Sequence, residues 1–208
     1  MGDKIYPIGI QNFEKIRNEG YYYVDKTALI YRLVKTGSYY FLSRPRRFGK
    51  SLLISTLEAY FQGKKELFEG LAMAQLEKNW IRRPVLHLDL NIGKYDAPDS
   101  LDKILEEALS KWEITYGTGV GETTLALRFK GIVERASQQS GQRVAILVDE
   151  YDKPLLQAIG NKELQSAYRN TLKPFYGVLK TMDGYIQFAM LTGVTKFGKV
   201  SVFSDLNN

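Results

Sequence analysis

The residues from Arg44 to Ser51, RPRRFGKS, have the types and spacing of a phosphate-binding loop. They follow the pattern G-x-x-x-x-G-K-S/T except at its first position, where Arg44 stands in place of glycine. In such a loop the backbone N–H groups face the phosphates, the lysine reaches the β- and γ-oxygens, and the hydroxyl ligates magnesium. Gly49, Lys50 and Ser51 meet these demands in order. Without the first glycine, the start of the loop must bend at Pro45 or adopt a conformation open to a β-carbon.

This loop also concentrates positive charge, because Arg44, Arg46, Arg47 and Lys50 lie close together in a chain of net charge +6. Such an excess suits a polyanion, either a nucleotide or a nucleic acid. A strand-to-helix turn with a capping serine and solvated arginines remains the alternative interpretation. The residues that we expect to contact the nucleotide are Arg46, Arg47, Phe48, Gly49, Lys50, Ser51 and Leu52.

A second group of polar residues follows the apolar run VAILV, where the chain continues as Asp149-Glu150. An acid at the end of a buried strand in a phosphate-loop enzyme orders the magnesium shell, so we assign Ser51 and Asp149 to the metal. Glu150 is then placed to polarise the attacking water as a general base. Two solvated acids after a strand are the alternative. Thr192 and Thr195 end the last apolar run, where they either sense the γ-phosphate or are ordinary turn hydroxyls.

The composition narrows the chemistry further. The 208 residues include no cysteine and one histidine, His87, which excludes disulfides and thiolate zinc sites and makes Ser-His-Asp catalysis improbable. A metal would be a hard cation with oxygen ligands, and magnesium fits best. No apolar run approaches the roughly 18 residues of a membrane span. We read no signal peptide and expect a cytoplasmic protein.

The elements that must position these residues alternate between strands and helices. We expect strands at 38–43, 84–90, 143–151 and 185–195. We expect helices at 28–35, from about 49, and at 99–116, 122–139 and 163–181, with helix and loop over 65–83. This alternation predicts an α/β fold in which a mainly parallel sheet lies between two helical layers. Ligands bind such sheets beyond the carboxyl ends of the strands, where the loop and the acidic pair both fall. The strand at 84–90 lies between them in sequence, as in ATPases with an additional strand and a catalytic glutamate.

Other candidates are weaker. His87 lies in the apolar strand VLHLDL and points to the same face as Asp89, which favours a packed or rim residue over a catalyst. The tyrosines at 21–23 precede Asp25-Lys26-Thr27. Core packing explains these tyrosines better than stacking on an adenine base does.

Four segments, YYYVDKT, FLSRPRRFGKSLLISTL, ILVDEYDKPL and LTGVTKFGKVSVFSDLNN, together resemble the AAA-ATPase-like family of bacterial proteins. By this resemblance the missing first glycine is a family trait, and the chain is expected to be a phosphate-loop nucleotide-hydrolase domain over 1–208. Residues 1–37 form an N-terminal segment before the first core strand. The resemblance implies ATP binding with magnesium and hydrolysis. It also implies a PD-(D/E)XK nuclease-like domain that often follows in family members, so the chain resembles an N-terminal part of a longer protein.

Two hypotheses of different classes follow. In the first, the chain is an ATPase in which Lys50 and Glu150 are catalytic. In the second, it is a nucleotide-gated module that hydrolyses negligibly and regulates the nuclease-like domain or another partner. Direct nucleic-acid binding by the basic loop is a third, disfavoured interpretation, because the same arginines cannot easily serve both ligands. The sequence leaves homo-oligomerisation open.

Overall fold

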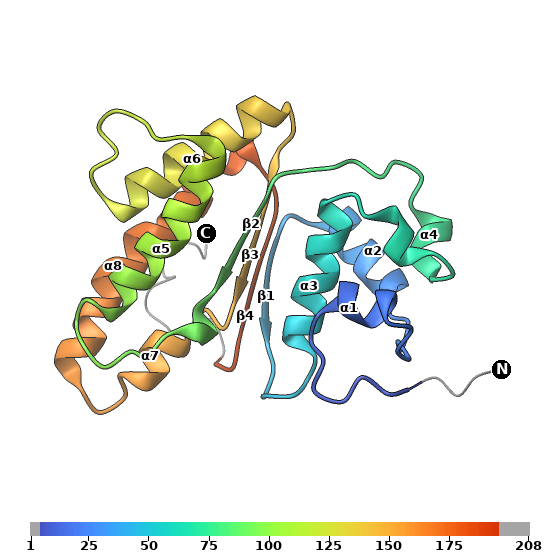
Figure 1. Ribbon diagram of the computed structural model, residues 1–208. Coiled ribbons are helices and arrows are strands. Elements are labelled where there is room, and N and C mark those ends of the chain that lie inside the picture. The colour runs from blue at the N-terminus through green and yellow to red at the C-terminus, as the bar shows by residue number, and fades with distance from the viewer. Residues whose placement is uncertain (1–4, 196–208) are drawn as a thin grey trace.

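The computed structural model describes residues 5–195 and shows a parallel β-sheet between two layers of helices (Figure 1). The four strands are hydrogen-bonded in the order β1-β4-β3-β2, and every pair is parallel. This arrangement confirms the expected α/β class. The strands are β1 (Tyr39–Ser43), β2 (Val85–Asp89), β3 (Val144–Asp149) and β4 (Ile186–Gly193).

The apolar runs become strands because both of their faces are buried. In β3 every residue is buried, and alternate side chains enter different cores. Ile146 and Val148 pack in the core under the helices of one face, whereas Ala145 and Leu147 pack in the core of the other. The sheet is thus the shared wall of two hydrophobic cores.

Helices cover both faces of the sheet, as Figure 1 shows. One layer consists of α1 (Phe13–Asn18), α2 (Thr27–Thr36), α3 (Lys50–Phe61) and α4 (Ala72–Leu76). The other consists of α5 (Ser100–Tyr116), α6 (Leu125–Ser140), α7 (Lys153–Gln157) and α8 (Lys162–Thr181). Short 3-10 turns occupy Lys65–Phe68, Leu90–Ile92 and Asp183–Tyr185. None of these helices has the length and apolar character to cross a bilayer.

The sheet order shows which strand lies between the loop strand and the acid strand. The strand that separates β1 from β3 in space is β4, whereas the strand at 84–90, which separates them in sequence, is β2 at the edge. Burial explains this outcome. All but one residue of β4 are buried, as a central strand requires, while β2 alternates between half-buried and buried residues. An additional strand therefore does lie between the loop strand and the acid strand.

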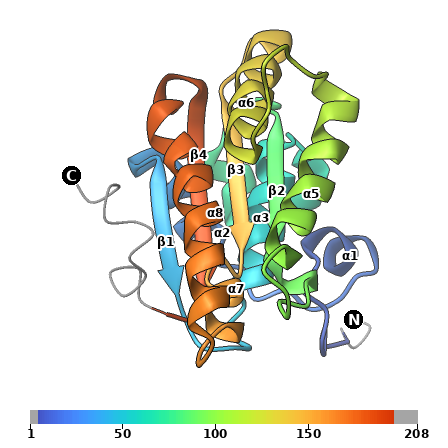
Figure 2. The same cartoon turned by 90° about the vertical axis from the view of Figure 1, so that its left-hand side faces the viewer.

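All four strands run in the same direction, so their carboxyl ends share one edge of the sheet (Figure 2). The register aligns Ser43 with Gly193 and Asp89 with Asp149 along that edge. Two short helices, α1 and α7, lie in segments where we expected none. The final part of the family-like sequence, 196–208, lies outside the described residues.

Candidate functional site

The loop between β1 and α3 has an unusual backbone. Arg47 and Gly49 both adopt left-handed conformations, with φ of 65° and 73°. Gly49 is the N-cap of α3 and adopts this conformation without the steric penalty of a β-carbon. Arg47 has a β-carbon, so the left-handed conformation is sterically unfavourable for it. Residues in this conformation form concave nests of backbone amides that bind anions. The loop therefore turns tightly into α3 without the first glycine of the usual pattern.

The beginning of α3 has free hydrogen-bond donors. Four successive backbone N–H groups have no acceptor among the described residues: those of Gly49, Lys50, Ser51 and Leu52. The next N–H group, that of Leu53, donates to the Gly49 carbonyl. Unpaired N–H groups at the start of a helix, together with the helix dipole, attract anions. The start of α3 therefore presents unpaired donors of the kind that attract an anion.

Lys50 is folded back over the loop rather than extended into solvent. Its Nζ donates to the carbonyl oxygens of Arg44 and Pro45, at 3.1 and 3.3 Å. The same Nζ forms an ion pair with Glu150 Oε1 at 3.1 Å, and its side chain is only 4% exposed. The loop lysine and the acidic strand end, which we singled out independently, are therefore in direct contact.

Asp149 joins three elements at the carboxyl edge of the sheet. Ser51 Oγ donates to Asp149 Oδ2 at 2.5 Å, although the two residues lie 98 positions apart in sequence. Thr192, which is completely buried in β4, donates its hydroxyl to Asp149 Oδ1. Thr192 therefore positions the carboxylate, and its contact with a γ-phosphate stays a prediction.

Glu150 has a strained backbone, with φ of 56° in the left-handed region that glycine favours. Its N–H donates to the Oδ1 atom of the preceding residue, Asp149, at 3.1 Å. This conformation turns the Glu150 side chain toward Lys50, and the side chain remains 17% exposed. Non-glycine residues in such conformations concentrate at functional sites.

Asp152 is a site residue that sequence reasoning missed. It is completely buried, and its carboxylate accepts hydrogen bonds from the N–H groups of Val194 and Thr195 and from the Thr195 hydroxyl. These bonds attach the segment after β4 to the start of α7. The one sequence feature that could have pointed to Asp152 is that it is the third acid in VDEYD, three positions after Asp149.

His87 and Asp89 lie on the neighbouring strand β2, and their hydrogen-bond partners are outside this cluster. His87 pairs with Glu58 of α3, with Nδ1 and Oε2 3.0 Å apart. Burial disfavours the charged imidazole, but the hydrogen bond and charge of Glu58 outweigh it and raise the pKa of His87. The hydrogen bond from His87 in turn lowers the pKa of Glu58, against the opposing effect of burial. Asp89 caps the turn at Leu90–Ile92. His87 is thus a half-buried residue paired with Glu58, and its exclusion from catalysis stays a prediction.

Of the loop arginines, Arg44, Arg46 and Arg47 are all exposed, and no carboxylate of the described residues pairs with them. Positive charge without an acidic partner beside free N–H groups raises the electrostatic potential felt by an anion. The structure leaves these guanidinium groups available for phosphate and equally for solvent.

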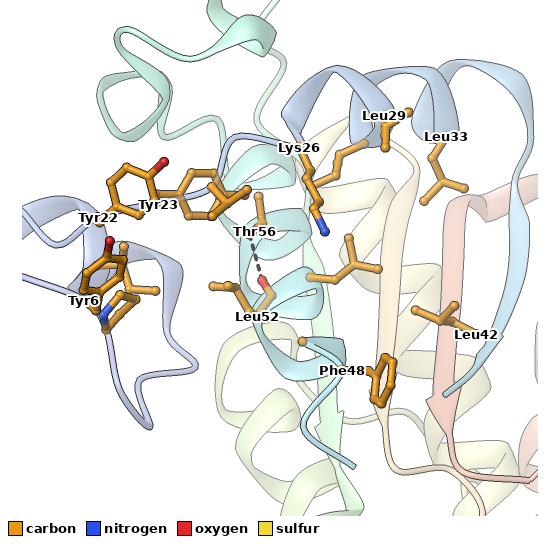
Figure 3. Close-up of a pocket in the computed structure, with 16 residues that line it drawn as sticks. Tyr6, Tyr22, Tyr23, Lys26, Leu29, Leu33, Leu42, Phe48, Leu52 and Thr56 are labelled. Atoms are coloured by element: carbon orange, nitrogen blue, oxygen red, sulfur yellow. Dashed lines mark hydrogen bonds between the residues drawn. The ribbon is translucent and has the colours of Figure 1, made fainter. Parts of the chain in front are cut away.

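An apolar pocket of about 510 Å³ adjoins the loop (Figure 3). Two of the three tyrosines at 21–23, Tyr22 and Tyr23, line this pocket, and Tyr23 also packs against a hydrophobic core. Tyr23 packs against Phe13 with ring centroids 5.1 Å apart, whereas Tyr22 is 43% exposed beside the pocket. The pocket is lined by Tyr6, Pro7, Ile16, Tyr22, Tyr23, Val24, Lys26, Leu29, Ile30, Leu33, Leu42, Phe48, Gly49, Leu52, Leu53 and Thr56.

Comparisons with known proteins identify the family of the chain. A family model described as "Predicted AAA-ATPase" matches residues 7–203. A protein of Azotobacter chroococcum mcd 1, described as "Uncharacterized protein in vnfD 5'region", is 43% identical over 210 residues. The match covers 100% of this chain and 40% of that relative, so the chain spans less than half of the relative's length. No solved structure matches. Family membership supports nucleotide binding in general, and over nearly its whole length the chain belongs to the predicted AAA-ATPase family.

Proposed function

We propose that this domain binds ATP with magnesium at the loop of residues 44–52 and hydrolyses it to ADP and phosphate. The observation that carries the proposal is the double link between the loop and the end of β3. Ser51 contacts Asp149, and Lys50 contacts Glu150, so four residues singled out by type and spacing meet at one helix start. Such a meeting of a loop lysine, a hydroxyl and two acids matches the needs of phosphoryl transfer.

The oxygen atoms at this point suit magnesium. Ser51 Oγ and the Asp149 carboxylate are hard ligands within 2.5 Å of each other. Across residues 5–195 no group of three or more His, Cys, Asp or Glu side chains is arranged to hold a metal by itself. Magnesium commonly takes only one or two protein ligands and completes its shell with phosphates and water, so this sparse set fits it. When bound, the ion neutralises charge on the β- and γ-phosphates.

The two side chains of the buried ion pair have separate roles. Lys50 offers an ammonium group that is already held within the loop by two carbonyl oxygens, so little ordering is needed before it contacts a phosphate. Glu150 offers a carboxylate that is partly exposed and ready to accept a proton from water. Competition of phosphate for Lys50 frees the Glu150 carboxylate for that task.

A nucleotide-gated module is the second candidate, and one observation favours it. The Glu150 carboxylate is held by Lys50, and a domain in which this pair persists would bind nucleotide without rapid turnover. The chain also spans only 40% of its relative, which leaves room for a region that such a switch would regulate. The PD-(D/E)XK nuclease-like domain suggested by the family resemblance is one proposal for that region.

Glu150→Gln separates the two functions. If Glu150 is the general base, the variant keeps its affinity for magnesium-ATP and loses turnover by about 100-fold, a typical effect of a positioned base. Phosphate release and equilibrium titration measure the two quantities, in this chain and in the longer protein that contains it. Glu163→Gln, an exposed glutamate in the first turn of α8, is the matched control. Equal turnover of Glu150→Gln and wild type would leave only the switch.

A further inference from the structure

A polar pocket of about 710 Å³ lies at the amino end of the sheet, away from the phosphate loop. Pro84 and Val85, at the start of β2, form one wall, and the ends of α3, α5 and α6 form the others. Figure 1 shows that the segment between α4 and β2 reaches this end of the sheet, whereas β1 leads into α3 at the opposite end. The volume lies within the range of small-molecule sites. The pocket is therefore separate from the proposed nucleotide site.

This pocket has an excess of positive charge. The described residues that line it include Lys64, Arg82 and Arg83 and no carboxylate. Lys64 is compensated by an ion pair, in which its Nζ lies 2.6 Å from Glu14 Oε2. Within residues 5–195, neither arginine forms an ion pair. Two uncompensated guanidinium groups in a concave site create a positive potential that favours an anionic ligand.

The two guanidinium groups also keep most of their hydrogen-bond donors. Arg83 donates through Nη1 alone, to Gln142 Oε1 at 3.1 Å and to the Arg143 carbonyl at 3.5 Å. The Arg82 side chain forms no hydrogen bond within the described part of the chain. Burial and the neighbouring charge of Arg143 lower the pKa of Arg83, so like charges already lie close together here. An oxyanion that accepts hydrogen bonds from both guanidinium groups would relieve this repulsion.

Three helices end at this pocket, and the negative end of a helix dipole attracts cations and repels anions. At α3 and α5, however, the last carbonyl groups already have other donors. The Phe61 carbonyl accepts a hydrogen bond from the backbone N–H of Arg83 at 2.7 Å. The Tyr116 carbonyl accepts one from Gln139 Nε2 at 3.0 Å. The guanidinium groups are therefore not the caps of these carbonyls, and their donors stay available to a ligand.

We propose that this pocket binds a small phosphate monoester, held by the guanidinium groups of Arg82 and Arg83. At neutral pH the phosphate of a monoester carries a charge of about −1.5 to −2 and three acceptor oxygens. Two guanidinium groups match this dianion better than they match a carboxylate or a phosphodiester, which carry a single charge. The phosphate occupies only part of the pocket, so the rest is left for the organic group of the ester. There Tyr116 offers its ring and a hydroxyl that has no partner among the described residues.

Titrations with phenyl phosphate, a monoester, and dimethyl phosphate, a diester, test this proposal. They are run at constant ionic strength and at about pH 7.5, where the monoester is a dianion. Nuclear magnetic resonance signals of the Nε–H groups of Arg82 and Arg83 report on this pocket and not on the phosphate loop. Phenyl phosphate should shift both signals saturably and bind at least about 10-fold more tightly than dimethyl phosphate, because its additional charge strengthens each hydrogen bond.

Arg82→Gln removes one guanidinium group without breaking a hydrogen bond between described residues. Followed through the Arg83 signal, it should weaken phenyl phosphate at least about 10-fold, the loss expected for a charge-assisted hydrogen bond. Arg169→Gln, at an exposed arginine of α8 outside the pocket, should not change the affinity. Lys50→Ala should not change it either, because Lys50 lies at the other end of α3. The proposal is overturned if phenyl phosphate causes no saturable shift, if dimethyl phosphate binds as tightly, or if Arg82→Gln binds like wild type.

Discussion

The Thr192 hydroxyl provides a sharp test of how the fold holds Asp149. Thr192→Val keeps the size and branching of the side chain and removes only the donor to Asp149 Oδ1. Asp149 would keep the hydrogen bonds from Ser51 Oγ and from the Glu150 N–H. The variant therefore isolates one of the three donors that the carboxylate uses.

The expected magnitude follows from the burial of the pair. Thr192 is 0% exposed and Asp149 is 5% exposed, so water cannot replace the lost donor. A hydrogen bond to a charged group contributes about 1.5–3 kcal/mol. For a domain of this size 1 kcal/mol corresponds to about 2–4 °C in Tm, so the variant should melt about 3–12 °C below wild type.

Thermal and urea unfolding at neutral pH measure this loss, and Thr171→Val is the matched control. Thr171 donates to Asp102 Oδ1 at 2.7 Å, also a hydroxyl-to-carboxylate bond, but on the half-buried surface between α8 and α5. Water replaces that donor, so the control should lose less than about 1 kcal/mol. An unchanged melting temperature for Thr192→Val, or equal losses in the two variants, would refute the bracing role.

Two further predictions concern stability. Asp152→Asn should lower the free energy of unfolding by about 1–3 kcal/mol in chemical denaturation, because a neutral amide oxygen replaces the charged acceptor of the Val194 and Thr195 N–H groups. Wild-type stability of the variant would contradict this. The pKa of His87 is raised in the folded protein, so its charged form stabilises the fold. This stabilisation is complete below pH about 6.5, the pKa of a free histidine, and is lost as the pH rises through the folded pKa. The free energy of unfolding should fall across that window in wild type and not in Glu58→Gln, and equal pH profiles would contradict the pairing.

The sequence could predict the meeting of the loop and the acids because the geometry of parallel sheets dictates it. Carboxyl ends of parallel strands share one edge, so a loop after one strand and an acid after another converge without knowledge of any contact. Lys50, Ser51, Asp149 and Glu150 do lie together. Their proposed chemistry stays a prediction.

The sequence could not predict features that depend on which distant segments become neighbours. Residues 84–90 lie between the loop strand and the acid strand in the chain, but in the sheet the nearly fully buried strand β4 lies between them. The brace from Thr192 follows from this central position. The hydrogen bonds of Asp152 and the pocket that Lys26 lines likewise depend on contacts between residues far apart in sequence. The periodicity of apolar residues does not predict such contacts.

The most direct test of the central claim is an equilibrium titration of ATP, with and without magnesium, into wild type and Lys50→Ala. Lys130→Ala, at an exposed lysine of α6 that forms no ion pair within residues 5–195, controls for the loss of charge. Wild type and the control should bind ATP, more tightly with magnesium. Lys50→Ala should bind at least about 10-fold more weakly while its circular dichroism and melting curve show a folded domain, because one ammonium-to-phosphate contact contributes about 1.5–3 kcal/mol. Unchanged affinity in folded Lys50→Ala would contradict the assignment of residues 44–52 as the phosphate site.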